Sequence, residues 1–108
     1  MPETCCTILN TAGSQEEADR LANLLVSEKL AACVQIIPIT SWYRWEGVVH
    51  HEGEYLLLIK TVTDLYPSVE AAILAHHSYE VPEIVQLSIT AGLERYLGWI
   101  AESVERDA

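Results

Sequence analysis

The chain contains 108 residues, of which half are apolar, and it carries 16 acidic against 6 basic side chains for a formal net charge of −10. This length predicts a single domain over residues 1–108, large enough for a real hydrophobic core. The charge argues against nucleic acid and anionic membranes as partners, because both attract basic surfaces. A negative field suits a cation ligand, although solubility is the plainer explanation.

The pattern of apolar and cysteine residues indicates a cytoplasmic protein. The first residues show neither the basic nor the apolar region of a secretory signal, and the apolar runs at 30–34 and 55–59 are far too short to span a bilayer. Three cysteines without paired spacing do not suit a disulfide framework. We therefore expect a reducing compartment and no contact with a membrane.

Hydrophobic periodicity and turn residues divide the chain into alternating strands and helices. Ser14 and Glu17 have the spacing of a capping box at a helix start. Pro67 suits a first helical turn, Pro82 ends helical structure before it, and Pro38 marks an edge or bend of a strand. In chain order, the predicted elements are a strand at 5–11, a helix from Ser14 to about Lys29, a strand at 32–39 that 40–45 could extend, a short segment at 48–52, a strand at 54–63, a helix from Asp64 to His76, a strand at 83–90 and a helix at 92–104.

This order is β-α-β twice, followed by a helix. It predicts the α+β class and a ferredoxin-like sandwich, in which an antiparallel sheet carries both main helices on one face. The continuous apolar run inside 54–63 suggests that this strand is buried on both faces. The third helix or, more readily, other subunits must then cover the second face, so the pattern predicts a homo-oligomer.

Two short segments concentrate rare residues. Residues 42–47 hold two of the three Trp, and residues 76–83 hold two of the four His. Neither has the pattern of a helix or strand interior, and connections with such side chains usually carry binding sites or subunit contacts. Aromatic residues and Arg dominate protein interfaces, so the Trp-Tyr-Arg-Trp run at 42–45 favours a subunit contact over a pocket for a planar ligand.

Candidate metal ligands are present but not grouped. Neighbouring His on a helix project about 100° apart, and neighbouring His on a strand face opposite sides, so neither 76–77 nor 50–51 can bind one ion as a pair. There is no Cys-x-x-Cys, and Cys5, Cys6 and Cys33 lie in contexts that indicate packing. Any metal site must combine distant segments or separate subunits.

Catalytic motifs are weak. The chain has no nucleophile elbow, phosphate loop or His-Glu-x-x-His sequence, and Glu80 and Glu83 beside Pro82 form an acid–base pair without a nucleophile. We therefore do not expect an enzyme. Lys60 is the unusual charge, because it lies inside an apolar strand, and we expect it to pair with a Glu or to project into a cleft.

Several signatures, in order, resemble the divalent-cation-tolerance (CutA) family between Cys6 and Val104. They are the segments at 27–34, 42–47, 76–83 and 96–100, together with Glu54 and the run at 57–61. The resemblance implies a ferredoxin-like fold in a compact homotrimer similar to PII signalling proteins, with edge strands pairing between neighbours and clefts between subunits. The residues that it places at these clefts and interfaces are Trp42, Trp45, Lys60, Tyr79 and Glu83.

Members of this family are associated with tolerance to copper and other divalent cations. The metal ligands carried over from the family are Glu54 and His76, whereas the position of the family's Cys ligand falls on Asn10. Without the thiolate the donors are oxygen and nitrogen, which suit Cu(II) or Zn(II) better than Cu(I). The resemblance thus implies a bound divalent metal ion that folding does not require.

Two hypotheses follow. In the first, the chain is a cytosolic homotrimer that binds divalent cations, copper among them, in metal tolerance and homeostasis. In the second, it is a PII-like signalling or assembly module whose inter-subunit clefts bind a small molecule or a partner protein, and the missing Cys favours this alternative. Hydrolysis by Glu80 or Glu83 is a third hypothesis, with less support because no nucleophile accompanies them.

Overall fold

The computed structural model describes residues 4–104, and within them the strands and helices follow the predicted order. A 3₁₀ turn at Thr63–Leu65 precedes the second helix, so that Pro67 lies in its first turn as expected. The elements are β1 (Cys5–Ala12), α1 (Gln15–Ser27), β2 (Cys33–Trp45), β3 (Val48–Val62), α2 (Tyr66–His76), β4 (Ile84–Ser88) and α3 (Glu94–Ser103).

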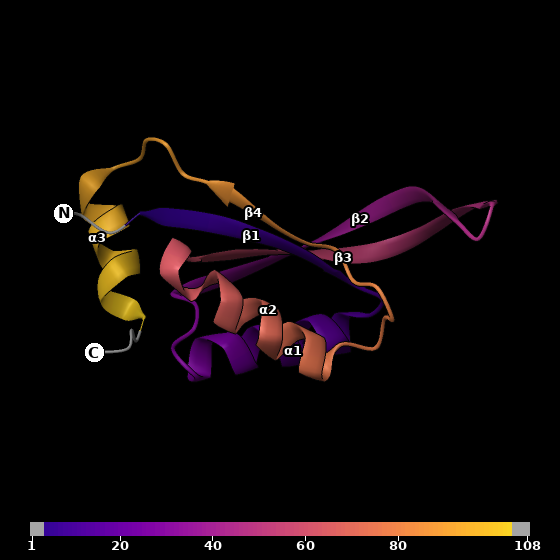
Figure 1. Ribbon diagram of the computed structural model, residues 1–108, viewed down its shortest axis with the longest axis horizontal. Coiled ribbons are helices and arrows are strands. Elements are labelled where there is room, and N and C mark those ends of the chain that lie inside the picture. Colours follow the sequence, from indigo (N-terminus) through magenta and orange to yellow (C-terminus); the bar gives the residue numbers. More distant parts are fainter. Residues whose placement is uncertain (1–3, 105–108) are drawn as a thin grey trace.

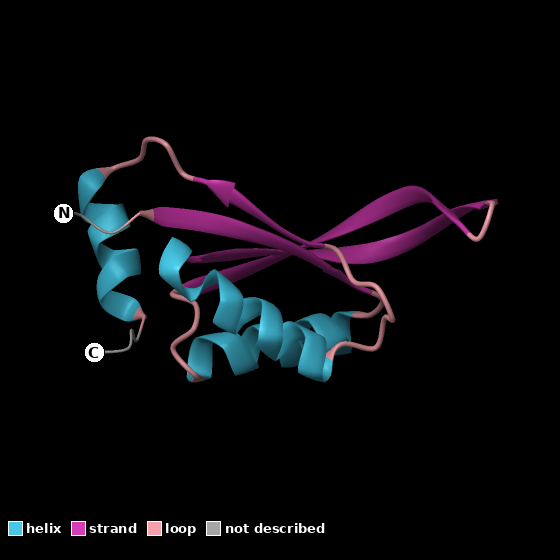
Figure 2. Cartoon of the chain, viewed as in Figure 1, coloured by secondary structure: helices cyan, strands magenta, loops and turns pink. Residues whose placement is uncertain are grey.

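The four strands form one antiparallel sheet in the order β2-β3-β1-β4. Helices α1 and α2 lie side by side on one face, and α3 lies across one end of the sheet (Figures 1 and 2). This arrangement is the α+β, ferredoxin-like sandwich that the order of elements predicted. It leaves β2 and β4 at the two edges of the sheet, as the proline in β2 suggested.

The core lies between the sheet and helices α1 and α2. Alternate residues of the strands point to this face, and the helices contribute the apolar positions of one stripe each. A smaller cluster joins α3 to the start of β1 and the end of β3 through Ile100 and Val104. The largest fully buried side chains of the main core are Ile8, Leu21, Leu25, Leu57, Ile59, Val69 and Ile73.

Strands β2 and β3 form a long hairpin, which corrects two predictions. The segment at 48–52 is not separate but belongs to a 15-residue strand, and residues 42–45 lie inside β2 rather than in a connection. Pairing between the strands continues without a break to Trp45 opposite Val48. The sequence analysis divided this strand at residue 53, between the segment at 48–52 and the strand at 54–63.

Stacked rings stabilise the outer part of this hairpin. The ring of Trp42 stacks on His51 with centroids 3.9 Å apart, and Tyr43 stacks on His50 at 5.3 Å. These two His therefore face opposite sides of the strand, as predicted, and each is matched to an aromatic residue across the pair. The turn uses Glu46 and Gly47, both with positive φ, as a two-residue hairpin requires.

The second face of the sheet is apolar and only partly covered within the described protomer. On β3, Leu57 and Ile59 are fully buried against the helices, whereas Leu56 and Leu58 on the other face are half-buried. The sequence predicted that both faces of this strand are buried. Within the described protomer, only the face covered by the helices is fully buried. Edge strands add three exposed side chains to this open face, which are Ile37, Val85 and Leu87.

Lys60 also lies on the open face of the sheet. Its Nζ donates a hydrogen bond of 2.9 Å to Oε1 of Gln35 on the neighbouring strand. The expected Glu partner is therefore replaced by an amide, so the charge of this lysine is not balanced by a carboxylate in the described chain.

Candidate functional site

A cleft of about 680 Å³ opens between the β2–β3 hairpin and the segment that leads from α2 into β4. This volume falls within the range of about 300–1,000 Å³ that is typical of small-molecule sites. Four of the lining side chains are carboxylates, four are aromatic and none is basic. The lining residues are Thr11, Ser41, Trp42, Tyr43, Trp45, Glu52, Glu54, Tyr79, Glu80, Val81, Pro82 and Glu83.

One wall of the cleft is a face of the hairpin. Glu52 and Glu54 are two residues apart on β3, so their side chains project to the same side of the strand. Tyr43 lies on this same face of β2, and its hydroxyl donates a hydrogen bond to Oε1 of Glu52. That hydrogen bond is the main reason why the pKa of Tyr43 is raised to about 12. The phenol therefore stays protonated at neutral pH.

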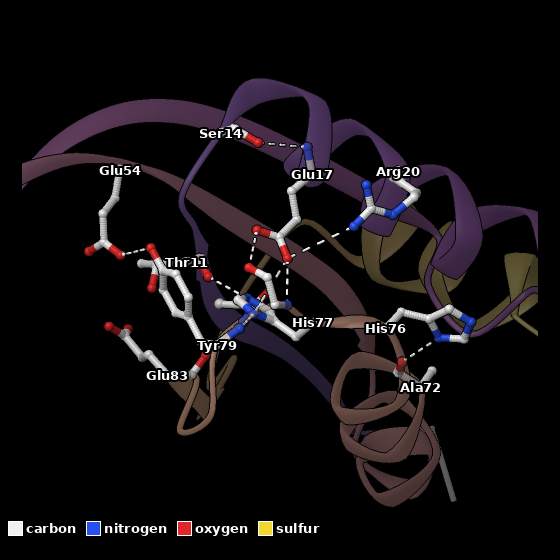
Figure 3. A network of polar contacts seen from close by, with 12 residues as sticks. Thr11, Ser14, Glu17, Arg20, Glu54, Ala72, His76, His77, Tyr79 and Glu83 are labelled. Atoms are coloured by element: carbon white, nitrogen blue, oxygen red, sulfur yellow. Dashed lines mark hydrogen bonds and ion pairs between the residues drawn. The ribbon is translucent and has the colours of Figure 1, made fainter.

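The other wall brings Tyr79 against Glu54. As a whole residue Glu54 is 8% exposed, and its Oε2 accepts a hydrogen bond of 2.8 Å from the Tyr79 hydroxyl (Figure 3). Burial first, and then this hydrogen bond, raise the pKa of Tyr79, which keeps the phenol a donor. Gly13 makes room for the ring, because a Cβ there would come within 3.1 Å of the phenol oxygen. Within residues 4–104, Glu54 has no cationic partner.

The segment bearing Tyr79 is fastened by the carboxylate of Glu17 on α1. Its two oxygens accept hydrogen bonds from the backbone N–H of Ser78 at 2.7 Å and from the Ser78 hydroxyl at 2.9 Å. Burial opposes the ionisation of Glu17, but the hydrogen bonds from Ser78 outweigh it and lower the pKa of Glu17. The charged form of this residue therefore stabilises the fold.

His77 completes the attachment of this segment. Its side chain is fully buried, its Nε2 lies 2.7 Å from the carbonyl oxygen of Thr11, and its Nδ1 lies 3.0 Å from the backbone N of Tyr79 (Figure 3). These partners assign the neutral tautomer, with Nε2–H donating and Nδ1 accepting. His77 thus has a structural role and has no lone pair left for a metal.

The two residues expected to bind a metal lie apart in the protomer. His76 is exposed on the last turn of α2, where its Nδ1 lies 2.9 Å from the carbonyl oxygen of Ala72, and Figure 3 shows it on the opposite side of the network from Glu54. The described part of the chain contains no group of three or more His, Cys, Asp or Glu able to hold an ion. Shared ligation by Glu54 and His76 stays a prediction, and it requires two subunits.

The remaining residues singled out from the sequence divide into two groups. Trp42, Trp45, Tyr79 and Glu83 all line the cleft, whereas Lys60 is not among the lining residues. Whether any of these five contacts a neighbouring subunit stays a prediction.

Asn10, where the resemblance places the family's Cys ligand, is fully buried and has a structural role. Its Nδ2 donates a hydrogen bond of 2.9 Å to the carbonyl oxygen of Glu83, which ties β1 to the segment entering β4. The cysteines of the described chain belong to no group of three or more candidate metal ligands. Cys5 and Cys6 are buried, and burial, followed by the charge of Cys5, raises the pKa of Cys6 to about 11, so it is a packing residue as expected. Cys33 is half-buried.

Sequence reasoning missed Glu17 and Glu52 as residues of the site. The capping box is present in part, since the Ser14 hydroxyl accepts a hydrogen bond from the Glu17 backbone, but the Glu17 carboxylate turns to Ser78 instead. No local pattern indicates a partner 61 residues away. For Glu52 a signal existed, because its spacing from Glu54 is that of one strand face, but the predicted elements placed Glu52 and Glu54 in separate segments.

Residues 6–103 match the family described as CutA1 divalent ion tolerance protein. The chain belongs to this family. It is 47% identical over 97 residues to the divalent-cation tolerance protein CutA of Thermus thermophilus, covering 89% of this chain and 94% of that protein. The chloroplastic CutA protein of Arabidopsis thaliana is 46% identical over 94 residues, covering 86% of this chain and 52% of that protein.

Solved structures of the CutA1 family confirm the fold. The crystal structure of CutA1 from Oryza sativa superposes with a TM-score of 0.94 at 39% identity and covers 98% of each chain. The structure of the periplasmic CutA from Archaeoglobus fulgidus gives a TM-score of 0.91 at 42% identity, over 94% of this chain and 99% of that chain. The family resemblance that the sequence signatures indicated is thereby confirmed.

The names of the relatives describe a role but not a single location. The relatives are named as tolerance proteins, not as enzymes. They include a chloroplastic and a periplasmic protein, so the family has no single compartment. Among the helices described here, none is long and apolar enough to cross a membrane.

Replacing Glu17 by Gln tests the attachment of the Tyr79 segment. We expect Glu17→Gln to lower the free energy of unfolding by about 1.5–3 kcal/mol at pH 7, because hydrogen bonds to a buried charge are lost. The folded pKa of Glu17 is lowered, so its stabilisation is present above the unfolded value of about 4.3 and is lost as pH falls through the folded pKa. The difference between the two proteins should therefore shrink as pH falls below about 4.

Urea denaturation at fixed protein concentration, repeated at several pH values, measures this difference. Glu16→Gln is the matched control, because Glu16 lies on the same helical turn but is exposed. Equal losses in the two variants, or a loss in Glu17→Gln that is the same at pH 7 and pH 3, would contradict the prediction.

Proposed function

We propose that this chain acts as a single-domain, cytosolic, homotrimeric protein that binds a divalent cation in metal-ion tolerance and homeostasis, without enzymatic activity. Membership of the CutA1 family and the names of its relatives support the general role. The observation that carries the proposal is Glu54, a carboxylate more than nine-tenths buried in a cleft without basic side chains. Its only hydrogen-bond partner in the described chain is a neutral phenol. A buried charge of this kind is stabilised by a cation.

The donor chemistry suits Cu(II) or Zn(II). If Nδ1–H of His76 donates a hydrogen bond to the carbonyl oxygen of Ala72, then Nε2 carries the lone pair that can bind a metal. Glu54 would supply the carboxylate oxygen that Tyr79 does not occupy. One protomer does not bring the two together, so the ligands would come from adjacent subunits. Asn10, in place of a thiolate, disfavours Cu(I).

Assembly into a trimer is supported by the open face of the sheet. This face presents Ile37, Val85 and Leu87, each more than two-fifths exposed, beside the half-buried Leu56 and Leu58. Strands β2 and β4 each lie at an edge, where their outer backbone groups have no strand neighbour among residues 4–104. Pairing edge strands between copies would satisfy these groups and bury the apolar face.

Light scattering behind a sizing column tests the trimer. We expect a mass three times that of the 12.1 kDa chain. Leu87→Glu should reduce the mass, because a charge would be buried at the interface, whereas Leu74→Glu on the outer side of α2 should leave it unchanged. Leu74 is a matched control since it is 56% exposed against 52% for Leu87. A monomeric wild-type protein would contradict the proposed assembly.

Calorimetric titration of the demetallated protein with Cu(II) and Zn(II) tests the ligands. We expect submicromolar binding that falls by at least about tenfold in His76→Ala and in Glu54→Gln, because each removes a metal ligand. His51→Ala is the control, since this exposed His is stacked on Trp42 and is not a proposed ligand. Weak binding that none of the variants changes would show that the family's metal site has been lost in this chain.

A second candidate is a PII-like signalling or assembly module whose cleft binds a small molecule or a partner protein. The cleft favours it, because a volume of about 680 Å³ with four aromatic side chains resembles a small-molecule site more than an ion site. The structural use of Asn10 at the family's Cys position points the same way.

A thermal-shift screen of metabolites and metals distinguishes the two candidates. A ligand that binds only the folded protein raises its melting temperature, so metabolites that do so in metal-free buffer would support the second candidate. We expect at least one class of organic compound to raise the melting temperature. Stabilisation by metals alone would count against this candidate and leave the first.

A further inference from the structure

Two carboxylates of the cleft, Glu52 and Glu54, form a pair with an unusual set of partners. They project from the same face of β3, separated along the strand by about 7 Å at a rise of about 3.4 Å per residue. Each accepts a hydrogen bond from a different tyrosine, Tyr43 for Glu52 and Tyr79 for Glu54. Neither forms an ion pair within residues 4–104. The phenols hold the carboxylates in place without balancing their charge.

The surroundings of this pair add negative charge and aromatic surface. Glu80 and Glu83 line the opposite wall of the cleft, so four carboxylates face one space that contains no basic side chain. Trp45, on the same face of the hairpin as Glu52, also lines it and is 43% exposed. Aromatic faces beside carboxylates are the environment that attracts ammonium ions, through cation–π contact and charge-assisted hydrogen bonds.

The geometry suits an extended cation better than a compact one. A metal ion needs several donors converging on one point, and the described chain contains no group of three or more candidate ligands. Glu52 and Glu54 are instead held apart, each by its own tyrosine. A chain with a positive charge near each end would place one charge at each carboxylate and lay its methylene groups along the aromatic side chains.

We propose that the cleft binds a linear aliphatic polyamine, with primary ammonium groups donating hydrogen bonds to Glu52 and Glu54. Further ammonium groups would face Glu80 and Glu83, so a triamine should bind more tightly than a diamine. This inference rests on the second candidate function, in which the cleft takes a small molecule, and it does not require metal binding. Both ligands would use Glu54, so a polyamine and a metal would compete.

The test is calorimetric titration of the full-length, demetallated protein, in its assembled state, with spermidine, butane-1,4-diamine, butylamine and butane-1,4-diol. We expect affinity to fall by about tenfold or more for each ammonium group removed, because each makes a charge-assisted hydrogen bond. The diol, which keeps the length but not the charge, should not bind. Binding of the diol as tight as that of the diamine would overturn the proposal, as would no binding of spermidine.

Charge variants locate the site. Glu52→Gln should weaken spermidine binding by about tenfold or more, whereas Glu28→Gln should not. Glu28 is the matched control because it removes the same charge from the exposed end of α1, outside the cleft. Equal weakening in both variants would mean that spermidine responds only to the net charge, and the proposal would fail. Melting temperatures of the variants confirm that each is folded.

A metal-ligand variant separates this inference from the metal proposal. His76→Ala should lower the affinity for Cu(II) and Zn(II) by about tenfold or more and leave the affinity for spermidine unchanged. If the thermal-shift screen finds other organic ligands but spermidine does not bind, the polyamine inference fails while the second candidate stands. If spermidine does not bind and Trp45→Ala breaks the assembly, the cleft is filled by a second copy of the chain, which also overturns the inference.

Discussion

The candidate site depends on the buried carboxylate of Glu17. By accepting two hydrogen bonds from Ser78, it fixes the backbone immediately before Tyr79, where no helix or strand holds the chain. His77 adds a second attachment, to β1. These contacts hold an irregular segment against α1 and β1, so that the Tyr79 hydroxyl reaches Glu54. A buried carboxylate on α1 thus helps to position the phenol that binds the buried Glu54 on β3.

The negative charges of the cleft are not balanced within the described protomer, and for this reason the proposed metal ion and the proposed polyamine are both cations. Tyrosines contribute hydrogen bonds to Glu52 and Glu54 but no charge, and the lining contains no Lys, Arg or His. A lysine on β3 could balance the charge of the cleft. Lys60 shows that this strand accommodates a lysine, but its Nζ donates a hydrogen bond to Gln35 and not to a carboxylate of the cleft. The negative field of the whole chain adds to the local charge. The local charge therefore favours cations, and the ligand's shape distinguishes a metal ion from a polyamine.

The sequence was sufficient for the fold because its patterns are local. Periods of two and of 3.6, the Ser14 cap and Pro67 fixed the order of strands and helices, and that order left few topologies. The site was only partly predictable. The region of the site was predicted from its rare Trp and His residues. The contacts that build the site were not predicted, because they join residues 25 and 61 positions apart in the sequence. The hairpin was divided wrongly because the strand pairing, rather than strand propensity, holds residues 48–53 in β3.

Asn10 shows how a single position links the fold to the choice of ligand. In this chain its amide ties β1 to the segment that enters β4, beside Glu83 in the cleft wall. An amide can make this contact because it donates through nitrogen, whereas a thiol is a weak donor. A soft thiolate ligand and this contact therefore cannot both occupy position 10. With an amide there, the carboxylates and aromatic side chains of the cleft wall select the ligand, and both proposed ligands, a metal ion and a polyamine, depend on them.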